Sequence, residues 1–176
     1  ITVYDGTPDQ KITFSSNPYD WLEASFFYTN IQGKPYPGYE SIQDYKDKGF
    51  NFKLRLKEEG KLPALAVGIN DIAGTGLYGS EYIVGSYGIG KLDMHFGIGW
   101  GAYNGSKYNF KNPFGYLDDR FENRAEPAGT LADTGAFQPG RYFSDESASP
   151  FFGISYLLKD SFLIKFEHDT TLTDNR

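Results

Sequence analysis

Two glycine-rich motifs are the first candidates for chemistry in this chain. Residues 74–79 match G-x-G-x-x-G, which dinucleotide-binding proteins use to hold a pyrophosphate, and residues 85–91 match G-x-x-x-x-G-K of phosphate-binding loops. In both motifs the glycines open a helix whose N-terminus faces the phosphate groups. Either motif therefore requires a helix directly after its glycines.

The residues that follow the motifs do not favour a helix. The β-formers Tyr82, Ile83 and Val84 come after the first motif, and Leu92 stands where a phosphate-binding loop needs Ser or Thr for Mg²⁺. We therefore interpret the glycines as turn and strand residues, with a tight hairpin at Gly90, and expect no nucleotide and no cofactor.

Catalytic and metal-ligating patterns are also weak. The chain has no cysteine and only two histidines, His95 and His168, and it contains neither G-x-S-x-G nor H-E-x-x-H. A catalytic triad needs a nucleophile and an orienting carboxylate beside its histidine. We therefore expect no catalytic residue and no metal site.

Strict alternation of apolar and polar residues identifies the elements that must position the remaining candidates. In GFNFKLRLKEEG, residues 49–60, Phe50 and Phe52 fall on one side of a strand while Lys53 and Arg55 fall on the other. The same period of two recurs along the chain. It predicts about eight strands, at residues 10–17, 20–31, 49–58, 62–71, 79–88, 91–103, 150–158 and 161–170.

The connections between these strands alternate in length. Short turns alternate with longer segments, and the longest predicted loops are 32–48 and the acidic 104–149. Transmembrane barrels combine short turns at one end with long loops at the other, and they need no long apolar run. The sequence predicts an all-β fold: one antiparallel transmembrane β-barrel domain over residues 1–176, with meander topology and forming part of a larger barrel.

The composition of the two strand sides also favours a membrane barrel over a soluble β-domain. One side is large and aromatic, whereas the other combines charges with small residues that suit a crowded interior. Aromatic residues near the predicted strand ends suggest an interfacial girdle. They are Trp21, Tyr28, Tyr82, Trp100, Tyr103 and Tyr156.

The polar strand sides supply the candidate lumen residues. They are Glu23, Lys53, Arg55, Lys57, Asp93, His95, Lys165 and Glu167. They form either a path for an anionic polysaccharide or a ladder in which carboxylates balance the cations. Asp71 and Glu81 flank the glycine loop, where they either bind a cation or polymer hydroxyls, or cap backbone N–H groups.

Several long stretches resemble the YjbH family of outer-membrane β-barrel proteins linked to exopolysaccharide and capsule production. The matching stretches are PYDWLEASFFYTNI (18–31), YKDKGFNFKLRLKEEG (45–60), LPALAVGINDIAGTGLYGSEYIVGS (62–86), FGIGWGAY (96–103) and NPF (112–114), with a weaker match at 151–169. The resemblance implies an N-terminal barrel portion of a longer protein in the bacterial outer membrane. It implies a non-catalytic role in exopolysaccharide secretion or surface assembly.

The implied partners are outer-membrane lipid, a polysaccharide and other capsule or exopolysaccharide export proteins. A net charge of −6 disfavours nucleic acid as a partner. The alternatives are a general diffusion porin, a barrel-type hydrolase that uses His95 or His168, and a soluble β-domain. Because the chain starts at Ile1, we expect a processed or partial protein.

Overall fold

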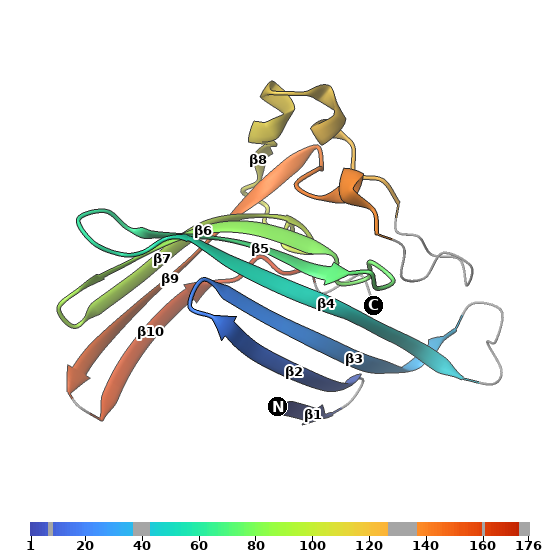
Figure 1. Cartoon of the computed structure of the whole chain (residues 1–176), viewed down its shortest axis with the longest axis horizontal. Helices are drawn as coiled ribbons and strands as arrows, with labels where there is room; N and C mark the ends of the chain where they lie inside the picture. The colour runs from blue at the N-terminus through green and yellow to red at the C-terminus, as the bar shows by residue number, and fades with distance from the viewer. Residues whose placement is uncertain (7–8, 37–42, 127–136, 160, 173–176) are drawn as a thin grey trace.

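The computed structural model describes residues 1–6, 9–36, 43–126, 137–159 and 161–172, and strands dominate it (Figure 1). The strands are β1 (Thr2–Asp5), β2 (Asp9–Tyr19), β3 (Leu22–Pro35), β4 (Asp44–Lys57), β5 (Ala64–Ile72), β6 (Ser80–Ile89), β7 (Leu92–Gly101), β8 (Phe110–Lys111), β9 (Ser147–Lys159) and β10 (Phe162–His168). Three short 3₁₀ helices, η1 (Pro113–Tyr116), η2 (Asp119–Glu122) and η3 (Pro139–Arg141), lie between β8 and β9. Among the described residues no helix is long and apolar enough to cross a membrane.

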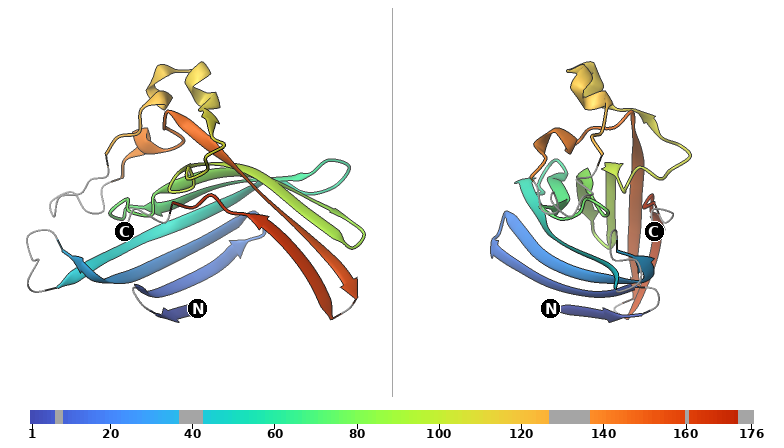
Figure 2. Two further views of the ribbon diagram at one scale, coloured as in Figure 1. Left: turned by 180° about the vertical axis from the view of Figure 1, so that it is seen from behind. Right: turned by 90° about the vertical axis from the view of Figure 1, so that its right-hand side faces the viewer.

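The strands form one antiparallel sheet in the order β1-β2-β3-β4-β5-β6-β7-β9-β10, with β8 paired to the start of β9. The sheet bends strongly around its own axis, as the end-on view in Figure 2 shows. The prediction of an all-β antiparallel meander is confirmed. Closure into a barrel is not seen, because no pairing joins β1 to β10 within the described ranges.

The predicted strands exist, but the sheet extends further than predicted. β1 and β8 were not predicted, which gives ten strands rather than about eight. Pairing of β3 with β4 continues through Ile31 and Tyr45 to Pro35 and Asp44, so strands occupy both ends of the predicted loop 32–48, and its positions 37–42 lie outside the described residues. The ladder continues there because backbone hydrogen bonds do not require apolar side chains. The predicted loop 104–149 also contains β8, the 3₁₀ helices and the start of β9.

The glycine motifs have no helix after them. Residues after 79 form β6 and residues after 91 form β7, so the structure supports the interpretation as turn and strand glycines. Gly90 has a φ of 62° in the tight β6–β7 turn, a conformation that glycine adopts without steric cost.

The two faces of the sheet have opposite character. We call the face that carries Phe52 the outer face and the face that carries Lys53 the inner face. Cross-strand rows such as Phe26–Phe50 and Phe52–Ile69 make the outer face apolar, and Phe50 and Phe52 remain exposed there. On the inner face, polar side chains such as Thr29 and Asp47 are buried. This polarity is the reverse of that of a water-soluble β-domain.

The prediction of an aromatic girdle is only partly correct. Trp21, Tyr28 and Tyr156 are exposed, as a girdle requires. Trp100 is fully buried, however, between Phe114 and Phe143. Tyr82 and Tyr103 line a cavity on the inner face, where a girdle residue does not lie.

Glycine positions on the inner face lie directly beneath rings from neighbouring strands. A Cβ on the glycine would collide with the ring of its cross-strand partner at Gly68, Gly97 and Gly153, and at Gly49 it would lie in tight contact with the ring, so the missing side chain makes room for the ring. The pairs are Phe27 with Gly49, Tyr82 with Gly68, Phe151 with Gly97, and His95 with Gly153. Ring and glycine together keep the inner face packed without overfilling it.

Replacing Gly97 by Ala tests this pairing. A Cβ at position 97 would lie 2.7 Å from Cε1 of Phe151 and 2.7 Å from the backbone oxygen of Ile83. We expect Gly97→Ala to lower the free energy of unfolding by about 1–3 kcal/mol, a typical cost of overpacking, as measured by urea titration in detergent.

Gly85→Ala is the matched control, because its Cβ would meet nothing closer than 3.7 Å. Equal stability of the two variants would contradict the steric role of Gly97.

Candidate functional site

The predicted lumen charges on β3 and β4 lie on the inner face. Lys53 and Glu23 are directly opposite each other, and their charged groups are 3.7 Å apart and about half exposed. Arg55 pairs with Glu58 at 2.9 Å, not with a carboxylate of another strand. Exposed pairs of this kind add little to stability. Lys57 lies beside a register shift at the end of β4.

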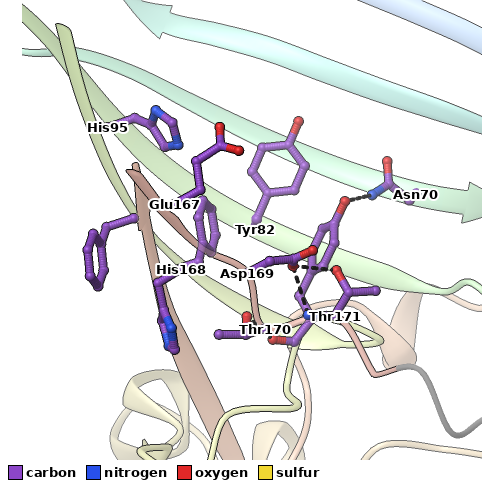
Figure 3. A pocket seen from close by; sticks show the side chains of 11 residues that line it. Asn70, Tyr82, His95, Glu167, His168, Asp169, Thr170 and Thr171 are labelled. Atoms are coloured by element: carbon purple, nitrogen blue, oxygen red, sulfur yellow. Dashed lines mark hydrogen bonds between the residues drawn. The ribbon is translucent and has the colours of Figure 1, made fainter. Parts of the chain in front are cut away.

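The predicted residues of β7 and β10 are connected through β9. Asp93 and Lys165 both pair with Ser155, while His95 and Glu167 both pair with Gly153. Each row therefore brings one residue of β7 onto the same face as one of β10. Figure 3 shows His95 and Glu167 turned toward the same space as Tyr82.

His168 lies on the other side of β10. It pairs with Phe152 and stacks on that ring, with 5.4 Å between the centroids. The two histidines therefore occupy opposite sides of their strands, although both border the same cavity.

Two neighbouring cavities are present on the inner face. The first, of about 390 Å³, is lined by Tyr82, His95, Tyr103, Phe151 and Glu167 together with polar residues at the ends of β5 and β10 (Figure 3). The second, of about 380 Å³, is lined by Lys53 and Arg55 and shares Tyr82 and His95 with the first. The shared side chains make the two cavities adjoining parts of one polar groove, which we call the inner groove. Sequence reasoning assigned Tyr82 and Tyr103 to the aromatic girdle, with Tyr103 also a candidate for stacking on sugar rings, and it named neither Phe151 nor Asn70 as a site residue.

Asp71 fixes the glycine loop against the inner face. The backbone N–H of Tyr78 donates to Oδ2 of Asp71 at 3.1 Å, and the N–H of Thr75 donates to Oδ1 of Asp47 at 3.0 Å. Tyr78 also packs edge-on against Phe27. Asp71 thus caps backbone N–H groups, one of the two roles considered for it.

Burial shifts the pKa values of this cluster, which lies against the glycine loop at one end of the sheet. Burial, with a further contribution from nearby Asp47, raises the pKa of Asp71 to about 8. Burial also raises the pKa of Asp47 and lowers the pKa of the Lys11 ammonium, whose charge is attracted by both carboxylates. The described residues include no group of three or more His, Asp or Glu arranged to hold a metal ion.

Glu81 does not join Asp71 in a common site. It lies in the outer-face row between Ile69 and Trp100 and is fully buried. Arg124 binds it through two hydrogen bonds, of 2.7 and 2.9 Å, and the N–H of Phe143 donates a third at 3.1 Å. The cavity that touches both Asp71 and Glu81 has a volume of only about 20 Å³, roughly the room needed for one water. The expected loop site for a cation or polymer hydroxyls therefore lacks space for a polymer.

Arg124 belongs to a layer that covers the outer face near the ends of β6 and β7. We call residues 112–126 and 137–146 the outer layer. Phe114 stacks on Trp100 and also contacts Phe121 and Phe143. The side-chain amide of Asn112 donates to three backbone carbonyls of the same layer. The layer and its ion pair were not predicted from the sequence.

Comparison with known proteins agrees with the sequence resemblance. The model of the family YjbH, described as exopolysaccharide biosynthesis protein YbjH, matches residues 1–173.

The chain belongs to the YjbH family.

Among the relatives of this YjbH-family chain is the uncharacterized lipoprotein YjbH of Escherichia coli (strain K12), which is 39% identical over 145 residues. The match covers 78% of this chain and 20% of the relative, so the chain spans about a fifth of that protein's length. No solved structure matches the chain. The membership predicted from the sequence motifs is confirmed.

Removing Arg124 tests how the outer layer is held. Arg124→Met leaves the Glu81 carboxylate buried without its cation, and loss of one partner from a buried pair costs about 3–5 kcal/mol. We expect a large loss of unfolding free energy in detergent and rapid protease cleavage within residues 102–146.

Arg120→Met is the control, because Arg120 is exposed and pairs only with neighbouring Asp118. If both variants resist urea and protease equally, the ion pair between Arg124 and Glu81 is not what holds the outer layer.

Proposed function

We propose that this chain is part of an outer-membrane β-barrel that serves exopolysaccharide secretion or surface assembly without catalysing a reaction itself. The observation that carries the proposal is the reversed polarity of the sheet. Exposed rows of Phe, Leu and Ile on the outer face suit lipid, while charged and polar groups are gathered on the inner face. The link to exopolysaccharide comes from the description of the family.

The open edges of the sheet support membership of a larger barrel. Among the residues that the structure describes, β1 and β10 each have one neighbouring strand, so each exposes an edge of unpaired backbone groups. In hydrocarbon, unpaired N–H and C=O groups are too costly to persist, and barrels avoid them by closure. We propose that further strands of the same protein pair with β1 and β10 and complete the wall.

The inner face favours an assembly or export role over a free diffusion pore. Asp47 and Asp71 hold the glycine loop down on that face at the loop end, which narrows the space that a closed barrel would enclose. A hydrolase has weaker support. Within the described residues, no hydrogen bond joins His95 or His168 to a serine or carboxylate.

Adjacent residues on β4 provide a direct test of membrane orientation. In a cysteine-free background of the full-length protein, Phe52→Cys and Lys53→Cys carry a fluorophore on opposite faces of one strand. We expect lipids with a nitroxide on the acyl chain to quench the label at 52, and aqueous iodide to quench the label at 53, because only the outer face meets lipid.

Strong iodide quenching at 52 together with no lipid quenching at either position would place the outer face in water and overturn the membrane proposal.

Deleting the gene in a strain that produces exopolysaccharide tests the role. We expect polysaccharide at the cell surface to fall while polymer inside the cell remains, because an export component acts after synthesis. Complementation with the full-length gene is expected to restore the surface polymer.

Unchanged surface polymer would refute the proposal. Loss of polymer both inside and outside the cell would instead indicate a step in synthesis.

A further inference from the structure

We infer that the inner groove binds uncharged hexose units of a polysaccharide, with Tyr82, His95 and Glu167 as the central contacts. This inference deepens the proposed function and rests on it for the identity of the polymer. The groove consists of the two adjoining cavities, each of a size typical of small-ligand sites.

Aromatic rings form one wall of this groove. The rings of Tyr82, Tyr103 and Phe151 are mutual neighbours, with centroid distances of 5.9 to 6.3 Å. Gly68 and Gly97 lie beneath two of these rings, so the rings lean over the sheet rather than filling the groove. Aromatic side chains with a polar tip combine an apolar surface with a hydrogen-bonding group, which matches the alternation of C–H faces and hydroxyls on a sugar ring.

The polar groups that face the rings are available for sugar hydroxyls. In the described part of the chain, the Tyr82 hydroxyl, the His95 imidazole and the Glu167 carboxylate make no hydrogen bond within the protein. By contrast, Tyr103 is already held by the amide of Asn70 at 3.2 Å. A few oriented donors and acceptors beside an apolar wall are the usual composition of a small-molecule site.

The charges of the groove select uncharged sugars over uronic acids. Glu167 and Asp169 carry negative charge at the aromatic part of the groove. The two cations of the second cavity, Lys53 and Arg55, are each paired with a carboxylate, Glu23 and Glu58. An anionic sugar stacked on Tyr82 would therefore meet carboxylates, whereas the hydroxyls of a neutral hexose donate to them.

The shared side chains also predict a length dependence. Tyr82 and His95 border both cavities, so a chain of several sugar units contacts both when it passes these two residues. A hexasaccharide should therefore bind more tightly than the disaccharide of the same linkage.

Isothermal titration calorimetry on the full-length protein in detergent tests the inference with maltohexaose, cellohexaose and laminarihexaose, their disaccharides, and trigalacturonate. We expect at least one hexaose to bind, more tightly than its disaccharide, and trigalacturonate not to bind. Glu167→Gln and Tyr82→Leu should each weaken binding about tenfold. Glu167 is exposed, so Glu167→Gln keeps the inference testable even if Tyr82→Leu fails to fold.

Tyr156→Leu is the matched control, because this tyrosine is exposed on the outer face. The affinity of this variant for the hexaose should be unchanged. Failure of every neutral hexaose to bind, binding of trigalacturonate alone, or unchanged affinity in Glu167→Gln would each overturn the inference. If the deletion strain loses surface polymer while no hexaose binds, the proposed function stands and the sugar site falls. If a hexaose binds but the deletion leaves the surface polymer unchanged, the sugar site stands and the proposed function falls.

Discussion

The alternation of side chains along each strand is the constraint on which the rest of this structure depends. A strand cannot turn one residue outward without turning the next inward. Because Phe52 occupies the outer face, Lys53 must occupy the inner one, and cross-strand pairing extends the same assignment to Glu23 on β3 and Ile69 on β5. One register therefore sets both the apolar surface and the polar interior. A shift by a single residue would exchange them throughout the sheet.

The second constraint is space on the inner face. Curling the sheet brings inner side chains together, and large rings fit there only where a neighbouring strand provides glycine, as Gly68 does for Tyr82. Several glycines outside the two phosphate-type motifs therefore have a packing explanation. The same pairs position the rings that border the inner groove, so packing and the proposed recognition of sugars depend on the same residues.

The sequence predicts this fold well wherever the period of two is strong. Alternation from Phe50 to Leu56 located β4 and assigned its faces, and long specific strings identified the family. The alternation over residues 91–103 puts Tyr103 on the same side as Asp93, which indicates the inner face, but the girdle interpretation took precedence. The ends of β3 and β4 were missed because polar residues continue a backbone ladder without an apolar signature.

Other features leave no pattern in a single sequence. The contact between Glu81 and Arg124 spans 43 positions, and no periodicity connects the two residues. Trp100 follows the outer-face alternation, so nothing local distinguishes a tryptophan that meets lipid from one covered by the outer layer. The proximity of Asp47 to Asp71 likewise depends on the way the glycine loop folds back onto the sheet.

The outer layer has a consequence for depth. It lies on the same face as the apolar rows, but its Arg124 guanidinium binds the buried carboxylate of Glu81 on β6 and several backbone carbonyls. Such a polar assembly is incompatible with acyl chains. If β7 enters a bilayer, the outer layer limits how deeply the strand can insert. The hydrocarbon boundary must then cross β7 on the Ile98 side of Trp100. The outer layer would thus mark the depth at which this strand leaves the hydrocarbon core.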